Sequence, residues 1–265
     1  MTARTMTLES GATARRSTPL LGFGTAVRKE ATEWLRSPKV PIIAGLSIVG
    51  AIFMTLLPIM AELSREAMPA GALSRDATTN VLSALAGQTA AVIAIIATMT
   101  LITVERDRGT LAWSLSNPVS PTAILAAKAV VAIVILAITT IALPLVVSYG
   151  VASVVYGTPD LGVVVRFAAL YLSVVVFYVT LTVALGTGIK STAGVAGAAI
   201  AVMILLPGIG QLVPFVNEIS PTSMGVWSLA AATGQAVPPL TPIAWAVSTV
   251  VIALVAIRVF ARQEP

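Results

Sequence analysis

The sequence contains six long apolar runs, and their length limits the folds that the chain can adopt. An α-helix needs about 20 apolar residues to cross a hydrocarbon core of about 30 Å, and each run supplies roughly that length. Transmembrane β-strands would be about 10 residues long with alternating polarity, which these runs lack. Only 10% of the 265 residues are charged, far fewer than in a soluble domain. We therefore predict an all-α, polytopic membrane protein with six transmembrane helices, at about residues 40–60, 81–104, 122–149, 163–189, 192–213 and 241–260.

Basic residues are distributed unevenly between the two predicted sides of the membrane. Of the 16 lysines and arginines, all but Arg65, Arg75 and Arg166 fall on the side that holds both termini. Since basic-rich segments stay in the cytoplasm, both termini are predicted to be cytoplasmic. The net charge of +5 reflects this bias, so no nucleic-acid partner is expected. The chain has no cysteine and no histidine, which excludes thiol chemistry and histidine-ligated metals, and we expect neither a metal nor a cofactor site in it.

Two segments precede the first span. Residues 1–24 are polar and small, which predicts a disordered cytoplasmic tail ahead of a six-span domain over residues 25–265. Residues 25–36 predict an interfacial helix, because Val27, Ala31, Trp34 and Leu35 share one face. Its expected membrane anchors are Trp34 at the headgroup level and the basic residues Arg28, Lys29 and Arg36. A solvated helix beside the membrane is the alternative.

Two further segments limit the chemistry of the chain. The turn "GTGIKST" lacks the spacing of a phosphate-binding loop, so any energy from ATP must come from another chain. In the outer segment, residues 214–240, Ser220 is a predicted N-cap and Pro221 a first helical residue. This segment predicts a short helix that either dips into the membrane or forms a structured loop.

Four charged residues, Glu105 to Arg108, stand side by side between the second and third apolar runs. We predict a short cytoplasmic helix over residues 105–117, with the acids in its first turn, where the helix dipole favours them. Asn117-Pro118 would end it, and Ser120-Pro121 would start the third span.

The stretch "ERDRGTLAWSLSNPVSPTAILAAK" resembles the segment after the second span of ABC-type-2 transporter permeases. In that family an E-x-E-R-x-x-G-T-like run leads to L-L-S-x-P-V-S-R and then to a lysine. Asp107 stands where a second glutamate is frequent, and Pro121 where arginine is frequent. The matching positions are Glu105, Arg108, Gly109, Thr110, Leu111, Leu115, Ser116, Pro118, Val119, Ser120 and Lys128.

The resemblance implies a non-catalytic permease subunit of a bacterial ABC exporter in the cell membrane. It implies two protein partners, a second permease subunit (identical or homologous) and a separate ATPase subunit that holds ATP and magnesium. Residues 105–117 would be the coupling helix that docks on the ATPase, with Leu111 and Trp113 in an apolar contact and Glu105 and Arg108 nearer its rim. The expected coupling residues are Glu105, Arg106, Asp107, Arg108, Gly109, Thr110, Leu111, Trp113 and Leu115.

Polar and small residues inside the spans are candidates for a transport path or a subunit interface. Gln88 and Thr98 could line a path, although most hydroxyls in spans bond to their own helix. Gly194 and Gly197 would allow another helix to approach closely, from a second subunit or from the same chain. Two other functions remain open, a secondary transporter and a non-transporting membrane assembly factor. The former is disfavoured because no ionised side chain lies well inside a span.

Overall fold

The structure, a computed structural model, describes residues 20–63, 76–107 and 120–262. These residues form helices and turns, with no strand among them, so the predicted all-α class is confirmed. Six helical segments in the described residues are long and apolar enough to cross a membrane. Their ranges are Lys39–Met60, Ala77–Asp107, Pro121–Val155, Leu161–Gly188, Thr192–Leu212 and Leu240–Ala261.

Two of the six spans are made of several helical pieces. The second span consists of α3 (Ala77–Ala86), α4 (Thr89–Thr98) and α5 (Thr100–Asp107), with a break between α3 and α4. The third consists of α7 (Pro121–Ala137), the π-helix η1 (Ile138–Ala142) and α8 (Leu143–Val155). A π-helical turn widens the helix by one residue without ending it, so the third span is continuous.

The other four spans are single helices, namely α2 (Lys39–Leu63), α9 (Leu161–Gly188), α10 (Thr192–Leu212) and α13 (Leu240–Ala261). The outer segment forms α11 (Pro214–Ile219), the 3₁₀-helix η2 (Pro221–Ser223) and α12 (Met224–Ala232). Ser220 caps η2, as its sequence context predicts, and α12 packs beside α9.

Short polar side chains fix where several spans begin. The Oγ of Ser120 accepts a hydrogen bond from the backbone N–H of Ala123 at 3.1 Å, and Pro121 takes the first helical position of α7. Asp160 caps α9 in the same way, and Ser191 caps α10. Each cap satisfies an N–H group that the helix itself leaves without a partner.

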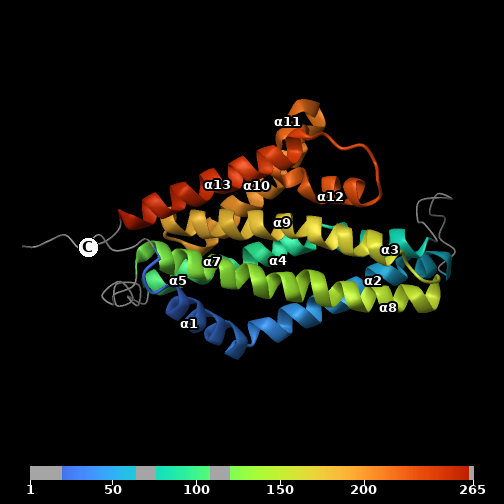
Figure 1. The fold of residues 1–265 in the computed structure, drawn as a ribbon, viewed down its shortest axis with the longest axis horizontal. Coiled ribbons are helices and arrows are strands. Elements are labelled where there is room, and N and C mark those ends of the chain that lie inside the picture. The colour runs from blue at the N-terminus through green and yellow to red at the C-terminus, as the bar shows by residue number, and fades with distance from the viewer. Residues whose placement is uncertain (1–19, 64–75, 108–119, 263–265) are drawn as a thin grey trace, which may run out of the picture.

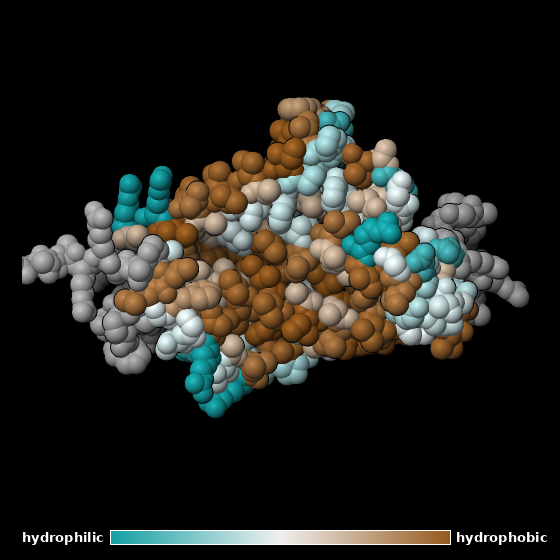
Figure 2. Space-filling view, in the orientation of Figure 1, coloured by the Kyte–Doolittle hydropathy of each residue, from teal (hydrophilic) through white to brown (hydrophobic). Residues whose placement is uncertain are grey.

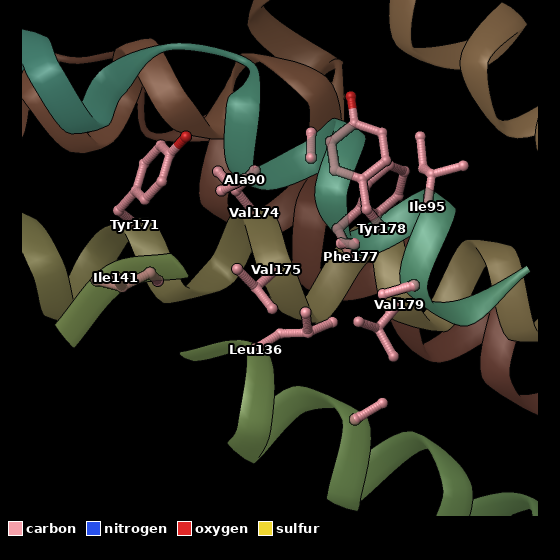
Figure 3. Close-up of a cluster of buried hydrophobic side chains, with 14 of the residues drawn as sticks. Ala90, Ile95, Leu136, Ile141, Tyr171, Val174, Val175, Phe177, Tyr178 and Val179 are labelled. Atoms are coloured by element: carbon pink, nitrogen blue, oxygen red, sulfur yellow. The ribbon is translucent and has the colours of Figure 1, made fainter. Parts of the chain in front are cut away.

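Helix α9 lies at the centre of the bundle. Half of its most apolar window is buried, against 11% in α13. In the core, Val175 and Val179 of α9 lie near Leu136 of α7, and Tyr178 lies near Ile95 of α4 (Figure 3). Outside this core the surface is a broad apolar band with charged residues toward its two ends (Figure 2), as expected of a bundle in lipid.

Helix α1 (Phe23–Arg36) packs against α7, at the end of the bundle where α13 also terminates (Figure 1). Trp34 is only 5% exposed and belongs to the protein core. The expectation that Trp34 anchors α1 in lipid is therefore wrong, because the apolar face of α1 meets another helix. The exposed side of α1 carries Arg28, Lys29 and Arg36, together with Leu35, which is 70% exposed.

Candidate functional site

A buried lysine pairs with two carboxylates at the end of the bundle where α1 lies. The Nζ of Lys128, on α7, is 2.8 Å from Oε1 of Glu30 on α1 and 2.7 Å from Oε1 of Glu105 on α5. The side chain of Lys128 is 2% exposed, that of Glu30 5% and that of Glu105 18%. We call these three residues the Lys128 cluster.

The carboxylates of the cluster depend on Lys128 for charge compensation. Moving one charge out of water costs several kcal/mol, and the attraction to oppositely charged partners offsets that cost when hydrogen bonds are also formed. Burial raises the pKa of the Glu30 carboxyl above its ordinary value, and the neighbouring carboxylates Glu105 and Glu33 raise it further. Lys128 opposes all three effects on the pKa of Glu30 through its charge and its hydrogen bond. Removing Lys128 therefore leaves two neighbouring carboxylates without a cation.

The cluster joins the two ends of the elbow, by which we mean residues 108–119 between α5 and α7. Glu105 stands three residues before the elbow, and Lys128 follows it near the start of α7. Glu30 ties both to α1. The backbone N–H of Ser120, at the end of the elbow, also donates to the carbonyl of Leu21, just before α1, at 3.0 Å. Both flanks of the elbow are thus fixed to one segment, residues 21–30.

Arg106 fixes the same end of α5 to the fourth span. Its guanidinium donates to the carbonyls of Gly186 (3.2 Å), Thr187 (3.0 Å) and Ile189 (3.3 Å), where α9 ends. The last carbonyls of a helix have no partner within it, and the helix dipole favours a cation there. A guanidinium, with five donors in a planar fork, can satisfy several of them at once.

Two hydroxyl contacts extend this network to neighbouring spans. The hydroxyls of Thr103 on α5 and Thr192 on α10 are hydrogen-bonded at 2.7 Å. The Nζ of Lys39, at the start of α2, donates to the hydroxyl of Thr100 on α5 at 3.2 Å. Helix α5 is consequently linked along its length to the first, third, fourth and fifth spans and to α1.

The acids at the start of the predicted coupling helix belong to a different element. Glu105, Arg106 and Asp107 form the last turn of α5 rather than the first turn of a new helix. Oε1 of Glu105 also pairs with Lys128 inside the chain. The remaining predicted coupling residues, Arg108, Gly109, Thr110, Leu111, Trp113 and Leu115, lie outside the described residues.

The candidates inside the spans occupy different environments. Gln88 is exposed at the break between α3 and α4, whereas Thr98 is 1% exposed and donates to the carbonyl of Ala94 on its own helix. A Cβ added to Gly194 would lie 2.9 Å from Cγ2 of Ile189, so this glycine serves a close contact within the chain. A Cβ on Gly197 would meet nothing within 4 Å. These positions of Thr98 and Gly194 favour packing roles for both.

Glu30 is the residue of the candidate site that sequence reasoning missed. Glu30 stands among the charged residues of the segment 25–36, yet positions 27, 30, 31 and 34 follow the spacing of one helical face. An acid on the apolar face of a helix was the available indication of a buried partner. Lys128 had been noted only as a match to a motif.

Three carboxylates near the cluster, Glu30, Glu33 and Glu105, lie close enough together to hold a cation. Lysines already supply the positive charge there. Lys128 forms ion pairs with Glu30 and Glu105. The Nζ of Lys29 lies 3.7 Å from Glu33 and 4.0 Å from Glu105. The arrangement therefore fits an ion-pair network better than a metal site.

Comparison with known families agrees with this architecture. The sequence profile of the ABC-2 family transporter proteins matches residues 25–263, from α1 to just beyond the end of α13. No curated protein matches the chain. Because the matched region includes all six candidate spans, this chain belongs to the ABC-2 transporter family and is a permease of that type.

Proposed function

We propose that this chain is the transmembrane subunit of an ATP-driven exporter and that its elbow docks on a separate ATPase subunit. One observation carries the proposal: both flanks of the elbow are fixed by buried charges to α1, and Arg106 fixes α5 to the end of α9. A movement of the elbow would therefore be transmitted through its fixed flanks to several spans at once.

The proposed complex has two permease subunits and two ATPase subunits in a bacterial cell membrane, with both permease termini in the cytoplasm. The family assignment and the excess of basic residues beside α1, the elbow and the end of α13 support this arrangement. The second permease subunit is either a copy of this chain or a homologue. Magnesium and ATP would bind the ATPase subunit, since the sequence has no phosphate-binding loop.

Charge substitutions in the elbow test the docking. Leu111→Asp and Trp113→Asp would each place an unpaired charge in a contact that we expect to be apolar, at a cost of several kcal/mol. Both variants should still insert in the membrane but should fail to retain the ATPase subunit in a pull-down. Thr158→Asp is the matched control, because it adds the same charge to an exposed turn that we place on the opposite side of the membrane.

Transport measurements separate this proposal from the alternatives. In proteoliposomes containing both subunits, Leu111→Asp and Trp113→Asp should abolish ATP-dependent substrate movement. A secondary transporter would keep its ion-driven transport in both variants and would need no ATPase. If the chain were an assembly factor, even the wild-type protein would show neither ATP-dependent nor ion-driven transport. Wild-type binding of the ATPase by both variants would refute docking through the elbow.

A further inference from the structure

The exposed surface of the second span differs from that of the other peripheral spans. Between residues 77 and 106, six positions are exposed, and only Ile96 among them is a large apolar residue. The other five, which we call the polar stripe, are Thr79, Ser83, Gly87, Gln88 and Thr89. The exposed positions of α13 between residues 240 and 255, by contrast, are all apolar.

The polar stripe follows one face of α3 and ends where the helix breaks. Thr79, Ser83 and Gly87 are four residues apart, so they lie above one another on a single helical face. From Thr79 to Thr89 the stripe spans eleven residues, or about 15 Å along the span at a rise of 1.5 Å per residue. All of its residues except Thr79 fall inside the apolar run of residues 81–104, which has no ionised side chain.

The backbone at the break cannot face lipid without a large penalty. Gly87 leaves the helical region with φ −63° and ψ 167°, so the last carbonyls of α3 and the first N–H groups of α4 lack the partners of a continuous helix. Unsatisfied backbone groups in hydrocarbon cost several kcal/mol each, and broken helices occur at membrane depth only inside protein or beside water.

Protein covers only one side of this break. The hydroxyl of Tyr171, on α9, donates to the carbonyl of Gly87 at 2.5 Å. A Cβ added to Gly225 of α12 would lie 3.9 Å from the carbonyl oxygen of Ala86. On the other side Gly87, Gln88 and Thr89 are exposed, so this side must meet water or another polar surface.

We propose that the polar stripe lines a water-filled vestibule of the transport path, open at the end of the bundle where α3 begins. The vestibule would accept ligands with uncharged hydrogen-bonding groups, because the exposed side chains between residues 77 and 106 are hydroxyls, one amide and one isoleucine. Exposed Ile96, seven residues beyond Thr89, marks the change to an apolar wall. The inference rests on the proposed function for its transport role but not for the presence of water.

Thiol accessibility tests the vestibule, and the cysteine-free chain needs no background substitutions. Single variants Ser83→Cys and Gln88→Cys would be exposed in intact cells to an impermeant methanethiosulfonate reagent. The matched control is Val250→Cys, because Val250 is 56% exposed and lies ten residues inside α13, as Gln88 lies eleven inside the second span. Thr158→Cys, in the exposed turn between α8 and α9, is the control for orientation.

A thiol reacts as its thiolate, which forms readily in water and not in lipid. We therefore expect Ser83→Cys and Gln88→Cys to react at least on the order of tenfold faster than Val250→Cys. Equal slow rates at Gln88→Cys and Val250→Cys would overturn the proposal in favour of lipid. A protected Gln88→Cys that forms a disulfide between two copies would overturn it in favour of a second copy of the chain. Full labelling after denaturation would show that each thiol is intact.

Two comparisons complete the test. Relative to Thr158→Cys, the Gln88→Cys variant should prefer a neutral hydroxyethyl reagent to a trimethylammonium reagent of similar size, and equal preference would overturn the ligand class. Thiol labelling requires neither the ATPase subunit nor transport. Its result therefore tests the vestibule separately from the pull-down of the ATPase subunit, which tests the proposed function. If Thr158→Cys reacts only in inside-out vesicles, the orientation of the proposed function fails, and the stripe is then tested from that side.

Discussion

Replacing Lys128 by methionine would remove the positive charge of the Lys128 cluster while keeping a side chain of similar length. Glu30 and Glu105 would then face each other without a cation, and the site is almost closed to water because Lys128 is 2% exposed. Removal of one partner from a buried ion pair costs about 3–5 kcal/mol. The free energy of unfolding should fall by that amount in detergent micelles, measured by titration with SDS and followed by tryptophan fluorescence.

Lys29→Met is the matched control, since Lys29 also lies near Glu105, at 4.0 Å, but its side chain is 48% exposed. Ion pairs in such positions contribute about 0–1 kcal/mol. The triple variant Lys128→Met/Glu30→Gln/Glu105→Gln removes every charge of the cluster and should recover most of the loss. Equal losses for Lys128→Met and Lys29→Met would refute the claim that the cluster acts as a buried unit.

The pH dependence of Lys128→Met gives an independent check. Burial raises the pKa of Glu30 above its ordinary value of 4.5, and Lys128 is the group that opposes the shift. Without Lys128, the folded chain binds a proton at Glu30 more tightly than the unfolded chain does. Stability should then rise as the pH falls from 7 toward 5 and decline as the pH rises through the raised pKa. The wild-type chain should change less over the same range.

Three further outcomes are expected. Arg106→Lys should lower the free energy of unfolding by about 1–3 kcal/mol, because one ammonium cannot reach three carbonyls. The control Arg258→Lys, at an exposed position of α13, should change this free energy by under about 0.5 kcal/mol. Trp34→Ala should lower the free energy of unfolding by about 3–5 kcal/mol in the SDS titration. Leu35→Ala, at the neighbouring exposed position, should lower it far less. Equal losses for the two variants would contradict the burial of Trp34 in the protein core. The purified chain alone should neither hydrolyse ATP nor bind it in isothermal titration calorimetry.

The number and type of spans could be predicted because they depend on local quantities. A run of about 20 apolar residues is sufficient for a transmembrane helix whatever surrounds it. The caps at Ser120 and Ser220 were likewise predictable, since a short hydroxyl side chain followed by proline acts on the next few residues only.

The Lys128 cluster could not be predicted in the same way, because Glu30 and Glu105 are 98 and 23 residues away from Lys128 in the chain. Hydrophobic periodicity identifies the apolar face of α1 but not what covers it. Trp34 is therefore predicted at the membrane interface, although its side chain is buried in the protein core. The break at Gly87 is also a tertiary feature. The carbonyl of Gly87 accepts a hydrogen bond from a tyrosine of α9, and the other side of the break is exposed. Neither property can be derived from the residues adjacent to Gly87 in the sequence.

The order of the three charges along the chain bears on how the protein is made. Glu30 and Glu105 are both synthesised before Lys128, which stands eight residues into a segment destined for the bilayer. A lysine entering a membrane helix alone is unfavourable to insertion. Here both acids have already left the ribosome when the third hydrophobic segment reaches the insertion machinery. The nascent chain thus carries its own counter-ions to the membrane in advance, and an N-terminal truncation that removes α1 would impair insertion of the third span as well as stability.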